Sequence, residues 1–136
     1  MMKGVQLIDL PKIKDPRGNL SFFENSNQIP FDIKRSYWIY DVPGGEKRGG
    51  HAFKKSKEFI VALSGSFDVV IHDGDEEKIF QLNRSYYGVY VPEMYWRELK
   101  NFATNTVVLI VSSTEYSEVD YILGFQEFKS IKNEIK

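Results

Sequence analysis

The sequence predicts an all-β domain, a sandwich or barrel, that ends in one short helix. Most of the 136 residues fall in segments where apolar and polar side chains alternate, the period of a half-buried strand. These segments are short and are separated at regular intervals by Pro, Asn and Gly, which is typical of sandwiches and barrels rather than βαβ folds. Only residues 125–135 place apolar side chains at helical intervals. We expect one domain that spans residues 1–136.

Seven segments have the length, the alternation and the β-branched or aromatic content of strands. They cover residues 34–40, 58–63, 66–72, 78–82, 87–91, 94–99 and 106–112. Asp73-Gly74-Asp75 separates the third segment from the fourth. Because glycine adopts positive φ without steric cost, this tripeptide predicts a hairpin turn.

The composition excludes several kinds of site and partner. The chain has no cysteine, so thiol nucleophiles, cysteine-ligated metals and disulfides are absent, and it has only two histidines. Its 18 Lys and Arg balance 19 Asp and Glu without a long basic run, which argues against nucleic acid as a partner. The N-terminus lacks a signal-peptide pattern, and the longest aliphatic run, 107–111, is too short to span a membrane. We expect a soluble cytoplasmic protein.

The segment from Gly45 to Gly65 carries the spacing of a metal-binding motif. His51 and Phe53 are two residues apart, so their side chains face the same side of a strand, and Glu58 follows on the next strand. This spacing resembles the first motif of the cupin superfamily, in which His-x-His and Glu converge on a metal. The resemblance implies a jelly-roll β-barrel.

A weaker form of the second cupin motif runs through residues 92–101 and places Arg97 where a histidine ligand is usual. Matched residue by residue, the four metal positions hold His51, Phe53, Glu58 and Arg97. Phenylalanine cannot ligate a metal, and arginine stays protonated and repels a cation. One histidine and one carboxylate are too few for a transition-metal site. We therefore expect a pocket of cupin type without a metal or another cofactor.

Further segments narrow the resemblance to one family. Residues 33–40 (IKRSYWIY) match the pattern I-K-R-x-Y-x-I, residues 47–55 (KRGGHAFKK) match R-G-x-H-A-H-K, and residues 15–20 (DPRGNL) match D-x-R-G-x-L. Residues 89–96 and 116–122 continue the match. Together they resemble the sugar 3,4-ketoisomerases that act on dTDP-4-keto-6-deoxyglucose, also grouped as WxcM-like cupins. The resemblance implies an isomerase that moves the keto group from C-4 to C-3, on the way to 3-amino-3,6-dideoxy sugars, and a homodimer.

The chemistry of this shift indicates which side chains to look for. A base must remove the C-3 proton, an enediol forms, and C-4 is then protonated. Imidazole suits the base, and His51 matches the first motif histidine. The family has a second histidine, taken to move protons between the two sugar oxygens, where this chain has Phe53. That step must use Tyr37, Glu58, water or the substrate itself, or else the activity differs.

Several side chains are candidates for binding the substrate. Arginine donates two parallel hydrogen bonds to phosphate oxygens, and we favour Arg17 and Arg48 because they lie in loops beside glycines. Arg97 is expected either to contact the keto oxygen or a phosphate or to be a solvated strand residue. Tyr95 is expected either to stack on thymine or to fill the core, and Glu58 to orient His51. The complete set of substrate-binding candidates is Arg17, Arg35, Arg48, Lys55, Arg97, Tyr95 and Phe53.

Two other functions remain open from the sequence. A nucleotide-sugar epimerase needs the same base and the same stabilisation of an enolate. A non-catalytic cupin that binds a dTDP-sugar is the other alternative, because Phe53 replaces the second motif histidine. His72, at the predicted hairpin, is expected to be exposed and outside the site.

Overall fold

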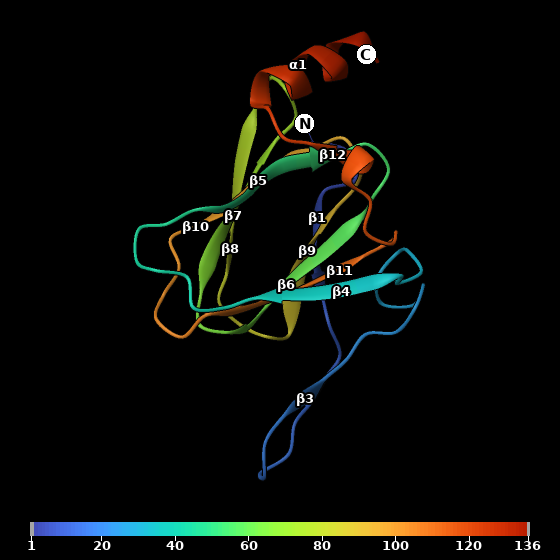
Figure 1. Cartoon of the computed structure of the whole chain (residues 1–136). Coiled ribbons are helices and arrows are strands. Elements are labelled where there is room, and N and C mark those ends of the chain that lie inside the picture. Colours follow the sequence, from blue (N-terminus) through green and yellow to red (C-terminus); the bar gives the residue numbers. More distant parts are fainter. Residues whose placement is uncertain (1, 136) are drawn as a thin grey trace.

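Two five-stranded antiparallel sheets face each other across a shared core in the computed structural model, which describes residues 2–135 (Figure 1). The first sheet contains, in spatial order, β1 (Gln6–Asp9), β9 (Tyr87–Val91), β6 (Glu58–Ser64), β11 (Val107–Ser112) and β4 (Arg35–Ile39). The second sheet contains, in spatial order, β12 (Tyr121–Ile122), β5 (Arg48–Phe53), β10 (Trp96–Lys100), β7 (Phe67–His72) and β8 (Glu77–Leu82). The predicted all-β class is confirmed.

The strands predicted from alternation are all present, and so is the hairpin between β7 and β8. Gly74 has a φ of 106°, as a glycine-centred turn requires. The sequence did not indicate β1, β12 or the hairpin of β2 (Lys12–Ile13) and β3 (Leu20–Ser21). Strands of two to four residues are too short to show a period, which is why they escaped notice.

Alternate residues of the facing strands fill the space between the two sheets. Ile60 and Ala62 of β6 lie in one cluster with Val69 and Ile71 of β7, and all four are buried. Burial of each of the Val and Ile side chains contributes about 1.5–3 kcal/mol. The same alternation turns Glu58, two residues before Ile60, toward this space, so one end of the core is polar.

The helix α1 (Phe125–Glu134) covers the outer side of the second sheet. Its Phe128 is fully buried against Ala52, Trp96 and Ile122. Ala52 alternates with the inward residues of β5, so the helix packs on the back of the strand that carries His51. No helix among residues 2–135 is long and apolar enough to cross a membrane.

The β2–β3 hairpin projects from the body of the molecule (Figure 1). Its apolar side chains Ile13 and Leu20 are each 54% exposed. Arg17 lies at the turn of this hairpin. The hairpin therefore carries apolar surface that this chain alone does not cover.

Candidate active site

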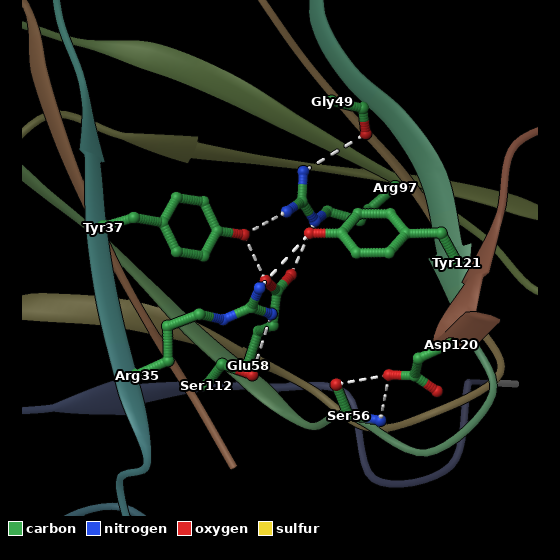
Figure 2. Close-up of polar contacts among 9 residues, drawn as sticks. All are labelled: Arg35, Tyr37, Gly49, Ser56, Glu58, Arg97, Ser112, Asp120 and Tyr121. Carbon is green, nitrogen blue, oxygen red and sulfur yellow. Dashed lines mark hydrogen bonds and ion pairs between the residues drawn. The ribbon is translucent and has the colours of Figure 1, made fainter. Parts of the chain in front are cut away.

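A cluster of polar and aromatic side chains occupies the polar end of the core, between the two sheets (Figure 2). It draws on β4 and β6 of the first sheet and on β5, β10 and β12 of the second. Its members are Arg35, Tyr37, His51, Phe53, Glu58, Arg97 and Tyr121. Strand alternation points each of them inward, because the residues on either side of them face the other way.

Arg97 connects the two sheets through a buried ion pair. Its Nε donates to Glu58 Oε1 at 2.7 Å, and both residues are 1% exposed. Nη2 donates to the Tyr37 hydroxyl at 2.9 Å, and Nη1 donates to the Gly49 carbonyl at 3.2 Å (Figure 2). The Tyr37 hydroxyl in turn donates to the other carboxylate oxygen of Glu58. Arg97 is therefore a buried support, and the alternative of a solvated strand arginine was wrong.

This network fixes the protonation of its members. Burial, reinforced by the Glu58 carboxylate and opposed by Arg97, raises the pKa of Tyr37 well above its usual value. Burial alone lowers the pKa of Arg97, but Glu58 and Tyr37 outweigh it, so the net shift is upward. Tyr37 is neutral and Arg97 charged throughout the physiological range. The expectation that Glu58 orients His51 was also wrong, because both carboxylate oxygens bind Arg97 and Tyr37 instead.

His51 faces this network from β5. Its Nε2 atom is buried and has no hydrogen-bond partner within residues 2–135. The imidazole centroid lies 4.7 Å from that of Phe53 and 4.9 Å from that of Tyr121. Burial, together with the positive charges of Arg97 and Arg35, lowers the pKa of His51 to about 3. The imidazole is neutral at pH 7, with a buried nitrogen available to a ligand.

Arg35 contributes the second buried polar atom that lacks a partner in the described chain. This atom is Nε. Nη1 lies 3.4 Å from the Tyr121 hydroxyl and Nη2 lies 3.4 Å from Ser112 Oγ, so both contacts are long (Figure 2). A half-buried arginine whose buried Nε has an unused hydrogen is typical of a site that receives an anion or a carbonyl oxygen.

Tyr121 is held in place by the residue before it. Asp120 accepts hydrogen bonds from the backbone N–H groups of Lys55 and Ser56 and from the Ser56 hydroxyl. These bonds tie the short 3-10 helix of residues 118–120 to the turn that joins β5 and β6. Tyr121 then pairs with Phe53 in the β12–β5 register. Its ring is therefore fixed beside Phe53, at 4.6 Å between centroids.

A cavity of about 610 Å³ opens beside this cluster. Tyr116, Glu118, Tyr121 and Leu123 line it. Tyr121 belongs both to the lining of the cavity and to the cluster, so the cavity borders the edge of the cluster.

The residues at the four cupin metal positions do not fit a metal ion. The Arg97 guanidinium is already bound to the Glu58 carboxylate, and Phe53 offers no ligand atom. Within residues 2–135, no three or more His, Asp or Glu side chains come together as a metal site. The positive charge that pairs with Glu58 is therefore the Arg97 guanidinium and not a metal ion.

Several predicted substrate-binding residues lie outside the cluster. Arg17 is almost fully exposed on the projecting hairpin, where it pairs with Asp15, and Arg48 is exposed at the start of β5. The side chain of Lys55 is exposed on the turn after β5. Tyr95 is buried in the core, with its hydroxyl donating to the Lys3 carbonyl at 2.6 Å. The arginines whose charges act on His51 are Arg97 and Arg35, and neither Arg17 nor Arg48 is among them.

His72 is neither fully exposed nor part of the cluster. It is half-buried, its Nδ1 accepts a hydrogen bond from the Gly74 N–H, and its ring packs edge-on against Phe125. The expectation of an exposed side chain was wrong because the helix covers this end of β7.

Sequence reasoning missed Tyr121 as a site residue. Residues 116–122 were part of the family resemblance, but nothing in that segment indicated contact with His51. Arg35 and Tyr121 are 86 positions apart, and β12 has only two residues. The signal that was available is the pair Asp120-Tyr121, in which a buried carboxylate precedes an aromatic residue.

Comparisons with known proteins agree with this fold. The family described as "FdtA: WxcM-like, C-terminal" matches residues 3–133. The TDP-4-oxo-6-deoxy-alpha-D-glucose-3,4-oxoisomerase of Aneurinibacillus thermoaerophilus is 39% identical over 124 residues, which cover 91% of this chain and 89% of that protein.

Two solved structures are similar over nearly their whole length. QdtA of Thermoanaerobacterium thermosaccharolyticum, a sugar 3,4-ketoisomerase in complex with TDP, has a TM-score of 0.96 and 36% identity, with 99% of this chain and 98% of that chain covered. WlaRB of Campylobacter jejuni, a TDP-quinovose 3,4-ketoisomerase, has a TM-score of 0.90 and 36% identity, with 95% and 99% covered. The resemblance that the sequence indicated is confirmed.

We predict that the substitution Arg97→Met lowers the free energy of unfolding by about 3–5 kcal/mol, because it leaves the Glu58 carboxylate buried without a countercharge. Denaturant unfolding measures the change. The double variant Arg97→Met/Glu58→Gln removes the stranded charge and should recover part of the loss. A single variant as stable as the parent would show that the ion pair does not hold the sheets together.

We predict that His51 stays neutral down to about pH 4, since its pKa is lowered to about 3. NMR titration of its ring protons, assigned with the His51→Asn variant, measures this. In the unfolded chain His51 is protonated near pH 6.5, whereas in the folded chain it stays neutral at that pH. Stability should therefore fall as the pH drops from 7 toward 4, and fall less in His51→Asn. Titration of His51 near pH 6.5 would contradict the assignment.

Proposed function

Because this chain belongs to the WxcM-like family, we propose that it is a 3,4-ketoisomerase, which moves the keto group of a dTDP-4-keto-6-deoxyhexose from C-4 to C-3. The observation that carries the proposal is the pair of buried atoms without partners in the described chain, His51 Nε2 and Arg35 Nε, in one cluster. A base and a cationic donor side by side meet the two needs of an enediol reaction.

His51 acts as the base in this proposal. The neutral imidazole accepts the C-3 proton on Nε2, the enediol forms, and the same nitrogen returns a proton to C-4. The low pKa of His51 comes from burial and from the two guanidinium groups of Arg97 and Arg35. A bound diphosphate offsets those charges and raises the pKa of His51 toward neutrality, so the substrate strengthens its own base.

Arg35 stabilises the charge that appears along the reaction path. Enediolate formation places negative charge on the sugar oxygens, and a fixed donor in a buried site stabilises this charge more than water does. The unused Nε of Arg35 is such a donor. Arg97 supports the site from behind through Glu58 and Tyr37, so this proposal requires no metal ion.

The product of this reaction is a 3-keto sugar, and a ketone at C-3 is what an aminotransferase needs. We therefore place the enzyme before an amino transfer, in the synthesis of 3-amino-3,6-dideoxy sugars. Epimerisation next to the ketone uses the same base, and it would leave the carbonyl at C-4. A non-catalytic sugar-binding role remains a candidate because of Phe53, which carries no proton.

A homodimer is part of the proposal. A two-stranded hairpin alone is marginal in water, and the β2–β3 hairpin exposes Ile13 and Leu20. The edge strand β4 adds Trp38, which is 59% exposed. A second copy packed by two-fold symmetry covers such surfaces and protects the edge. Arg17, on the hairpin, can bind substrate only in a site that such a partner completes.

We predict that the protein, incubated with dTDP-4-keto-6-deoxyglucose in deuterated water, incorporates deuterium and shifts the carbonyl to C-3, as followed by NMR. His51→Asn should lose turnover by at least about 10³-fold, because the proton acceptor is gone, while its affinity for dTDP stays within about twofold. Tight dTDP binding without exchange would instead establish the non-catalytic role. Exchange with the carbonyl still at C-4 would establish the epimerase.

We predict a dimer in analytical ultracentrifugation at micromolar concentration. The paired change Ile13→Ser/Leu20→Ser should shift the equilibrium toward monomer, because it removes the apolar surface of the hairpin that a partner covers. Leu123→Ser, which changes an exposed apolar residue far from the hairpin in sequence, serves as the control. A parent protein that sediments as a monomer would contradict the assembly.

A further inference from the structure

The proposed ketone shift requires a second proton transfer that His51 cannot perform alone. As the C-4 carbonyl becomes a hydroxyl, O-4 gains a proton, and as the C-3 hydroxyl becomes a carbonyl, O-3 loses one. Carbon and oxygen protons therefore move in parallel, and a group with an exchangeable proton near both oxygens is needed. The need for this second group rests on the proposed function.

Most polar groups of the cluster are already engaged. The Tyr37 hydroxyl donates its proton to Glu58 and accepts one from Arg97. Burial also raises the pKa of Tyr37, so it is a poor proton donor. Glu58 uses one oxygen on each of these partners, and Phe53 has no proton to give.

Tyr121 differs from them in its hydrogen bonds. Its hydroxyl accepts a hydrogen bond from Arg35 Nη1 at 3.4 Å, and no acceptor for its own proton occurs within residues 2–135. Figure 2 shows this hydroxyl pointing into the cluster, toward Arg35 and Glu58. The ring lies 4.9 Å from His51 between centroids, and it also lines the cavity of about 610 Å³. Tyr121 thus both contacts the proposed base and lines the cavity.

We propose that Tyr121 is the catalytic acid and base at the sugar oxygens. Its hydroxyl gives its proton to O-4 while His51 takes the proton from C-3, which yields the neutral enediol. The Tyr121 oxygen then takes the proton of the O-3 hydroxyl while His51 returns its proton to C-4. Both residues end as they began, and no oxidant, reductant or further reactant is needed.

Arg35 and Asp120 help to position the Tyr121 side chain for this role. Arg35 Nη1 lies 3.4 Å from the Tyr121 oxygen and can donate to it whether or not the oxygen carries its proton. Asp120, buried and bonded to the turn that joins β5 and β6, fixes the backbone from which the ring projects. The ring itself is packed against Phe53 and His51, which limits its rotation.

The test is Tyr121→Phe, which removes only the hydroxyl. We expect kcat for carbonyl transfer to fall by about 10²–10³-fold, the usual contribution of a general acid–base group, with dTDP affinity by calorimetry within about twofold. Tyr40→Phe is the matched control. Tyr40 is 60% exposed, directly follows β4, and belongs neither to the cluster nor to the lining of the cavity, so removal of its hydroxyl should leave kcat within about twofold of the parent.

A rescue variant separates proton transfer from packing. Phe53→His in the Tyr121→Phe background places a titratable ring 4.6 Å from the altered side chain. We expect it to restore at least about tenfold in kcat, with a new dependence on pH in the range where imidazole titrates. A packing defect would not be repaired in this way.

The outcomes distinguish this inference from the proposed function. If Tyr121→Phe keeps the parent kcat, the assignment of Tyr121 fails while the isomerase stands. If the variant loses dTDP binding together with activity, or if Phe53→His restores nothing, Tyr121 is structural and the inference also fails. If the parent protein itself transfers no carbonyl, the proposed function fails and takes this inference with it.

Discussion

The buried ion pair between Arg97 and Glu58 is the constraint on which the rest of the site depends. It joins β10 of one sheet to β6 of the other, and it carries Tyr37 and the Gly49 carbonyl with it. A Cβ at position 49 would lie 2.2 Å from Arg97 Nη1, and the φ of Gly49 is +69°, so only glycine fits there. The guanidinium thereby sets the path of β5 two residues before His51.

The positive charge of Arg97 also helps to keep His51 neutral. A neutral imidazole beside two guanidinium groups is the state that burial and electrostatic repulsion both favour, as the lowered pKa of His51 reflects. The cost of burying Arg97 is offset by Glu58, whereas Arg35 keeps a buried donor unused. Two guanidinium groups and one carboxylate leave the cluster with an excess of positive charge, which favours the binding of an anion.

Alternation allowed the strands and the inward face of β5 to be predicted, because the period of two is a local property of the chain. It could not show which strands face each other across the core. Glu58 and Arg97 are 39 positions apart, and the sequence suggested that Glu58 orients His51 instead. The preference for Arg17 and Arg48 failed for the same reason: glycine neighbours indicate a permissive backbone, not proximity to His51. Contact between sheets depends on topology, which alternation does not encode.

The replacements at the four cupin metal positions change which side chains can act on a substrate. A metal ion bound to Glu58 would present an open position to a substrate. The Arg97 guanidinium instead donates hydrogen bonds from its three nitrogen atoms to Glu58, Tyr37 and the Gly49 carbonyl. Arg97 therefore has no nitrogen atom left for a substrate, and its role is to support the rest of the cluster. The groups with unused capacity are His51 Nε2, Arg35 Nε and the Tyr121 hydroxyl, and Tyr121 also lines the cavity. Phe53 carries no proton, but its ring packs against both His51 and Tyr121. It therefore serves as an apolar contact that keeps these two rings next to each other.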